Sequence, residues 1–158
     1  MSNYGDYEDN FAICVNMWKS ITDKHGDNAL ATEFTPEERA VVLIVFVEGI
    51  VYRDGFEGLF QSKLAGDPDY KFTLEAFERI GCAEAVETLK EALRLFPEGS
   101  PPRDDKVRME QYMNHPEGIR NSIDSRFWGS HESIYKCLAN YIRERTRLFA
   151  SYGQILIS

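Results

Sequence analysis

Three glutamates have a spacing that could present a row of negative charge to another molecule. Glu84, Glu87 and Glu91 lie three and four residues apart, so on an α-helix they would share one face, with charges about 4.5 to 6 Å apart along the axis. Phosphates follow one DNA strand at intervals of about 3.4 Å, which is of the same order. The row could therefore form a surface that competes with nucleic acid for a basic protein. The alternative is an ordinary solvated helix face, because Lys90 and Arg94 each follow one of these glutamates by three residues.

A second candidate site is a bend that directly follows the most apolar segment of the chain. It consists of Asp54, Gly55, Phe56 and Glu57. Functional side chains often lie on loops that a rigid scaffold holds, so the two carboxylates could line a pocket for a small molecule or a substrate. The alternative is structural, with Asp54 capping the next helix and Phe56 filling the core.

Histidine and cysteine patterns do not indicate a metal site or nucleophilic catalysis. The residues concerned are His25, His115 and His131, and Cys14, Cys82 and Cys137. The histidines lack the short spacings of metal sites, and we expect surface or capping roles for them. The cysteines form no Cys-x-x-Cys pair, so we expect buried thiols in a reducing compartment. Motifs for phosphate binding or a nucleophilic serine are also absent from the sequence, which predicts a protein without catalysis and without a cofactor.

Charge is distributed unevenly along the 158 residues, which carry a formal net charge of −8. Residues 1–118 hold 23 acidic and 12 basic side chains, whereas residues 119–158 hold 3 and 6. An acidic surface repels nucleic acid, so direct binding to DNA or RNA is not expected. The acidic N-terminus does not resemble a signal peptide, and the apolar run 40–47 is too short to cross a membrane. We therefore expect a cytoplasmic protein.

The clearest helix start lies just before that apolar run. Thr35 can cap the free amides, Pro36 fits the first helical position, and Glu38 can complete a capping box. The run 40–47 is rich in β-branched residues and by itself would pass for a buried strand. Because a capping box precedes it, we interpret it as a central helix that is buried on every side.

Apolar residues at helical spacing predict further helices along most of the chain. These cover residues 11–21, a short piece through 59–60, 72–80, 83–96, 103–114, 119–128 and 130–149, the last with Ser130 as its cap. Pro and Gly in residues 97–102 predict a loop. The expected architecture is a single all-α domain over residues 1–158, with about seven helices around the central one. The tail 151–158 is apolar, so we expect it to dock on the body or on another subunit.

Several segments together resemble a bacterial family of all-helical domains whose best-described member is a DNA mimic. They are residues 48–60, which correspond to the family's Gly-Gly-Phe segment, and residues 76–81, 91–97, 123–128 and 141–143. Their order and spacing extend the resemblance over about residues 35–147.

This resemblance implies a compact helical fold without known catalysis. The described member is an acidic dimer that occupies the DNA-binding surface of a transcription factor. For this chain, the leading hypothesis is thus an acidic face, with Glu84, Glu87 and Glu91, that binds a basic, DNA-binding protein. One alternative is a small-molecule or enzymatic site at residues 54–57. Another is a subunit of a larger assembly, such as a homodimer, with residues 155–157 of the tail and the basic last helix forming the contact.

Overall fold

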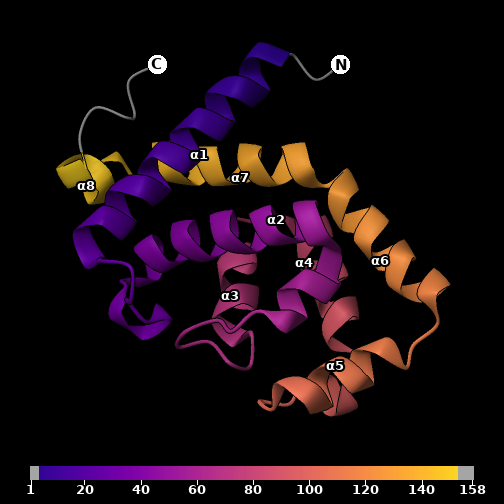
Figure 1. Ribbon diagram of the computed structural model, residues 1–158. Helices are drawn as coiled ribbons and strands as arrows, with labels where there is room; N and C mark the ends of the chain where they lie inside the picture. Colours follow the sequence, from indigo (N-terminus) through magenta and orange to yellow (C-terminus); the bar gives the residue numbers. More distant parts are fainter. Residues whose placement is uncertain (1–3, 153–158) are drawn as a thin grey trace.

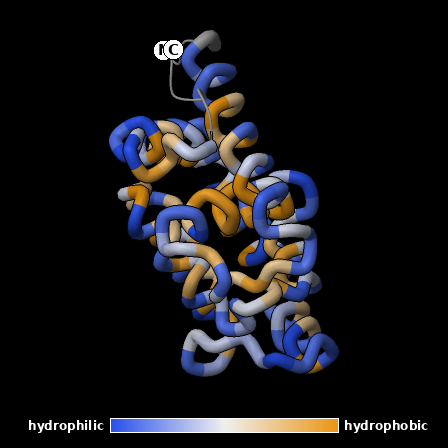
Figure 2. The backbone as a smooth tube through the Cα atoms, turned by 90° about the vertical axis from the view of Figure 1, so that its left-hand side faces the viewer, coloured by the Kyte–Doolittle hydropathy of each residue, from blue (hydrophilic) through white to orange (hydrophobic). Residues whose placement is uncertain are grey.

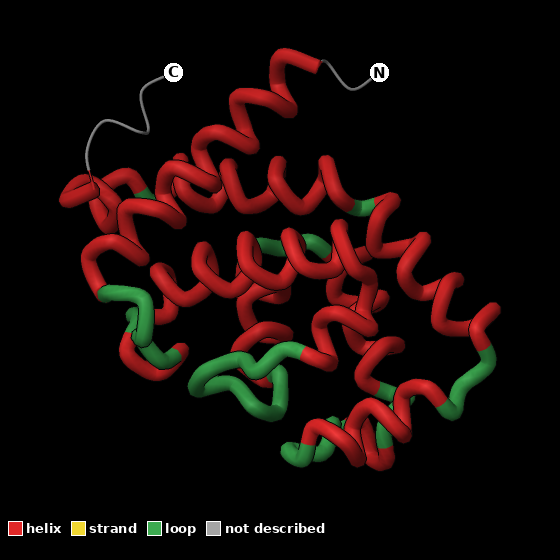
Figure 3. The backbone as a smooth tube through the Cα atoms, viewed as in Figure 1, coloured by secondary structure: helices red, strands yellow, loops and turns green. Residues whose placement is uncertain are grey.

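Helices make up all the regular structure in the described part of the chain. A computed structural model describes residues 4–152, is 78% helical, and shows no strand among these residues (Figure 3). The α-helices are α1 (Tyr4–His25), α2 (Pro36–Gln61), α3 (Lys71–Arg79), α4 (Ala83–Leu93), α5 (Asp105–Met113), α6 (Glu117–Gly129), α7 (His131–Glu144) and α8 (Thr146–Phe149). Short 3-10 helices cover Ala31–Glu33, Pro97–Gly99 and Ala150–Tyr152. The prediction of an all-α fold is confirmed, although the loop 97–102 contains one 3-10 turn.

Helix α2 begins as the capping box predicts. The Thr35 hydroxyl accepts a hydrogen bond from the Glu38 amide at 3.2 Å, and the Glu38 carboxylate accepts one from the Thr35 amide at 3.0 Å. Pro36 is the first helical residue. These bonds satisfy amides that a helix start leaves free, so the β-branched run that follows is helical rather than extended.

The interpretation of α2 as buried on every side is wrong. Val41, Ile44 and Val47 are fully buried, but Phe46 is 41% exposed. Helices α1, α3, α5, α6 and α7 all pack against α2, yet they leave one strip of its surface open. This open strip, which includes Phe46, gives the molecule an apolar surface that faces solvent.

The other helices are arranged in two groups around α2. In Figure 1, α1 and α7 pack together on one side of α2, α3 to α5 lie on the other, and α6 joins the two groups at one end. Figure 2 shows hydrophobic turns gathered in the interior and hydrophilic turns outside. None of the helices described combines the length and apolar character that crossing a bilayer requires.

The predicted helix 130–149 is interrupted. Arg145 has non-helical backbone angles and separates α7 from α8, while its guanidinium lies 3.7 Å from the centre of the Tyr141 ring. Ser130 precedes α7, but its hydroxyl donates to the Arg126 carbonyl at 3.4 Å and caps nothing. Of the predicted tail 151–158, residues 151–152 are described, and the Tyr152 hydroxyl donates to Glu38 of α2. Residues 153–158 lie outside the described residues.

Candidate functional site

The predicted glutamate row lies on α4, where its members differ in environment. Glu84 and Glu87 are exposed, on the side of α4 opposite the buried Ala85, Leu89 and Ala92. This arrangement follows from the amphipathic pattern of the helix, which directs its apolar stripe into the core.

Two basic side chains reduce the charge of the row. Lys90 lies 3.8 Å from Glu87, as the sequence suggested. Glu91 instead pairs with Arg126 of α6, and this hydrogen bond lowers the pKa of Glu91. Among the described residues, only Glu84 of the three has no ion-pair partner. The row is therefore most negative at the N-terminal end of α4.

The predicted bend is present as a sharp break at Gly55, where the two helical segments that together form α2 meet. Gly55 has φ +71°, which an L-residue rarely adopts. The freed Phe56 amide donates to the Asp124 carboxylate at 2.9 Å, and this carboxylate also approaches Gly55 so closely that a Cβ there would lie 2.6 Å from an oxygen. Asp124 of α6 therefore supplies the cap that the sequence assigned to Asp54.

The four bend residues point in different directions. Gly55 and Phe56 are buried, and Phe56 fills the core as the structural alternative expected. Asp54 is exposed and accepts a hydrogen bond from Arg53 at 2.8 Å, while Glu57 is half-buried. Burial raises the pKa of Asp124, with Glu57 adding to the effect, so the break holds a carboxylate that binds its proton more tightly than usual.

Sequence reasoning missed a polar cluster that joins three helices. Glu48 of α2 is buried, contacts His131 Nδ1 and accepts a hydrogen bond from the Tyr135 hydroxyl at 2.9 Å. The Tyr7 hydroxyl of α1 lies 2.6 Å from His131 Nε2. His131 is thus largely buried and not the surface residue we expected. Glu48 could have indicated this cluster from the sequence. It ends the apolar run of α2, and a buried carboxylate needs partners from elsewhere in the fold.

A second buried carboxylate, Glu38, connects the first and last described elements. It accepts a hydrogen bond from the Tyr152 hydroxyl and lies 3.2 Å from His25 Nε2. Burial by itself would raise the pKa of Glu38, but the hydrogen bonds from Tyr152, the Thr35 amide and His25 outweigh it and lower the pKa to about 2. His25 therefore packs at the start of α2.

The remaining histidine and the cysteines have structural environments. His115 Nε2 lies 2.7 Å from the Leu95 carbonyl. Cys14 and Cys82 are buried as expected, whereas Cys137 is only half-buried. Burial raises the pKa of Cys14, and burial together with the neighbouring Cys137 raises that of Cys82 to about 12. Since the thiolate is the nucleophile, neither buried thiol is activated.

An apolar pocket of about 360 Å³ opens near the exposed strip of α2, away from the bend. The residues that line it include Trp18 of α1, Val42 and Phe46 of α2, and Leu64. Residues 54–57 do not line this pocket.

Comparison with known proteins places this acidic helical domain in a family. The model of the DMP19-like protein family matches residues 32–145, from just before α2 to the end of α7. The chain therefore belongs to the DMP19-like protein family. No curated protein and no solved structure matches the chain significantly.

Proposed function

We propose that this chain is a DNA-mimic-type domain that binds a basic partner protein and acts without catalysis. The observation that carries the proposal is the outer face of α4, where Glu84 and Glu87 are exposed. Membership of the DMP19-like family and the excess of 26 acidic over 18 basic side chains support the same function. The partner would be a DNA-binding protein whose basic surface this face occupies.

The three glutamates contribute unequally to this proposed contact. Glu84 provides most of the attraction, because among the described residues it has no ion-pair partner. Lys90 and Arg126 partly compensate the charges of Glu87 and Glu91 within the molecule. Attraction between exposed charges accelerates association, and salt screens it over a Debye length of about 8 Å at physiological ionic strength. Complex formation should therefore weaken as salt is raised.

Capture from a lysate of the source cell, followed by displacement, tests the proposal. The immobilised chain should retain DNA-binding proteins at low salt, and added duplex DNA should release them, since both would compete for one basic surface. Recovery of no DNA-binding protein, or of proteins that duplex DNA does not displace, would contradict the proposal.

Two charge-matched triple variants locate the contact. Glu84→Gln, Glu87→Gln and Glu91→Gln together should reduce capture. The control is the combination of Glu98→Gln, Glu110→Gln and Glu117→Gln, which removes three exposed carboxylates from other parts of the surface. Equal loss of capture in both variants would indicate attraction by net charge alone, and would remove α4 from the proposal.

A further inference from the structure

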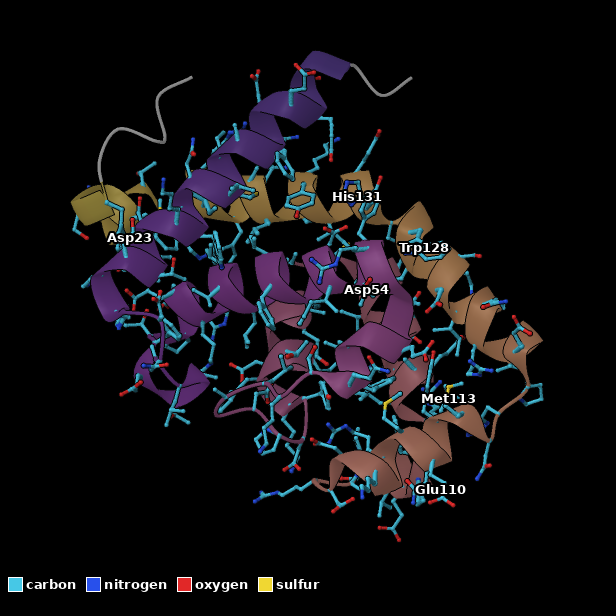
Figure 4. All side chains as sticks on the ribbon, in the orientation of Figure 1. Asp23, Asp54, Glu110, Met113, Trp128 and His131 are labelled. Atoms are coloured by element: carbon cyan, nitrogen blue, oxygen red, sulfur yellow. The ribbon has the colours of Figure 1, made fainter. Side chains whose placement is uncertain are left out.

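Two exposed aromatic rings lie near His131, close to the break in α2 and to the junction of α6 and α7. Tyr52 is 57% exposed, and its ring stacks on His131 with centroids 4.3 Å apart and planes 24° apart. Trp128 is 43% exposed, and its indole N–H donates to the Val51 carbonyl at 2.8 Å. Figure 4 shows Trp128 and His131 in the same region of the molecule, far from Glu110.

His131, which supports Tyr52, is itself immobilised. Its Nδ1 contacts the buried Glu48 and its Nε2 lies 2.6 Å from the Tyr7 hydroxyl, so the imidazole cannot rotate without breaking these contacts. It thus presents a fixed face on which the Tyr52 ring stacks. Ordered aromatic side chains lose little conformational entropy on binding, and they are typical anchors of protein interfaces. We call Tyr52, Trp128 and His131 the aromatic site.

Charge and stacking indicate which group this site would receive. Elsewhere the chain covers its own rings with cations, namely Lys24 at Tyr152, Arg39 at Phe72, Arg120 at Tyr112 and Arg145 at Tyr141. In the part of the chain that the structure describes, no Lys or Arg stacks on Tyr52 or Trp128. The adjacent Arg53 is bonded to Asp54 at 2.8 Å.

The carboxylates around the site add a negative field. Burial raises the pKa of Tyr7, and the charges of Glu48 and Glu132 raise it further, so both carboxylates act at the Tyr7 hydroxyl, which contacts His131. A cation placed over an aromatic face is attracted by the ring quadrupole, and nearby negative charge strengthens that attraction. Arginine fits better than lysine, because its planar guanidinium can stack on a ring.

We propose that the aromatic site binds an arginine side chain of the partner protein against Tyr52 and Trp128. This inference takes from the proposed function only the expectation that the partner is basic. The site lies on α2, α6 and α7 and does not include the glutamates of α4, so the two contacts can be tested separately.

Peptides of defined charge test the site without knowledge of the partner. The protein is the full chain carrying Trp18→Phe, which leaves Trp128 as the single indole. The probes are an Arg-Gly repeat peptide, the same peptide with lysine, and the same peptide with uncharged citrulline. The arginine peptide should change Trp128 fluorescence at saturation and bind more tightly than the lysine peptide, while the citrulline peptide should bind least.

Variants of Tyr52 then separate stacking on the Tyr52 ring from attraction between net charges. Tyr52→Ala should weaken binding of the arginine peptide by about 2- to 30-fold, the range expected for a cation–π contact, while Tyr52→Phe retains the ring and should bind as before. Tyr52 is exposed, so the fold should survive, as circular dichroism would check. Equal binding of the arginine and lysine peptides, an unchanged Kd for Tyr52→Ala, or unchanged Trp128 fluorescence would overturn the aromatic site. Those results would leave the displacement of captured proteins by DNA unaffected.

Discussion

Single residues decide the local geometry at the break in α2. Gly55 adopts a positive φ and lets Asp124 approach to within bonding distance of the Phe56 amide. A side chain at position 55 would both strain the backbone and displace the carboxylate that caps the second half of the helix.

Gly55→Ala should therefore lower the free energy of unfolding by about 2 to 4 kcal/mol, from backbone strain and loss of the Asp124 hydrogen bond. Urea denaturation followed by circular dichroism measures it. Gly49→Ala is the matched control, because Gly49 is exposed in the same helix and a Cβ there would meet nothing within 4 Å. The control should raise stability by about 0.5 to 1 kcal/mol, as alanine does in a helix interior. Similar effects of the two variants would refute this account of Gly55.

Arg108 is the second residue with a large expected effect. It is 4% exposed, and its guanidinium donates to the carbonyls of Phe60 at 2.6 Å and Pro102 at 2.9 Å. Arg108→Lys keeps the charge but cannot reach both carbonyls, so it should cost about 2 to 3 kcal/mol in the same assay. Arg103→Lys, at an exposed side chain, should change stability by less than about 0.5 kcal/mol. A loss at Arg108 as small as at Arg103 would contradict the bonding role.

At the scale of elements, the start of α2 is tied to the end of the described chain through Glu38 and Tyr152. Folding lowers the pKa of Glu38 from its ordinary value of 4.5 to about 2, so the folded protein holds this proton less tightly than the unfolded chain. The stabilisation from Glu38 is thus fully present above the unfolded pKa, and it is lost as the pH falls through the folded pKa.

Glu38→Gln should accordingly destabilise the protein at about pH 6, and this difference from the unsubstituted chain should shrink as the pH approaches about 2. Urea unfolding at a series of pH values measures it. Tyr152→Phe removes one donor to the carboxylate and should show a smaller difference with the same direction of pH dependence. A difference between Glu38→Gln and the unsubstituted chain that stays constant with pH would rule out this linkage.

The helices differ in how far sequence could define them. The capping box at Thr35 and Glu38 is local, and it correctly identified α2 despite the β-branched run. The prediction failed at Arg145, where α7 ends inside a continuous apolar pattern, and at Ser130, whose hydroxyl bonds back into α6. In both cases the side chain contacts the residue four positions earlier, Tyr141 for Arg145 and Arg126 for Ser130, and the apolar periodicity does not encode these contacts.

At the scale of the whole molecule, the folding unit is larger than the family match. The match begins at residue 32, but Cys14, Met17 and Ile21 of α1 are fully buried, and α1 packs against both α2 and α7. Helix α1 also contributes Tyr7 to the polar cluster around His131. Without α1, apolar surface of α2 and α7 would face water.

A chain that lacks residues 1–26 should therefore lose cooperative unfolding. Removing fully buried side chains leaves an incomplete core, and each large apolar truncation alone costs about 2 to 5 kcal/mol. Urea titration followed by near-ultraviolet and far-ultraviolet circular dichroism should show no sharp transition. Met17→Ala in the full chain should give a partial loss, and Lys19→Ala, at an exposed position, almost none. A cooperative transition at the original midpoint for the shortened chain would show that residues 27–158 fold by themselves.

The sequence by itself determined the helical class, the start of α2, the bend at Gly55 and the row of glutamates on α4, because periodicity, capping and glycine chemistry act over a few residues. Only the tertiary structure decided which polar groups meet. It paired Glu91 with Arg126, Glu48 with His131, and the Phe56 amide with Asp124. These partners lie 35 to 83 residues apart in sequence. The packing of α1, α2, α4, α6 and α7 brings them together, and no local pattern encodes that packing.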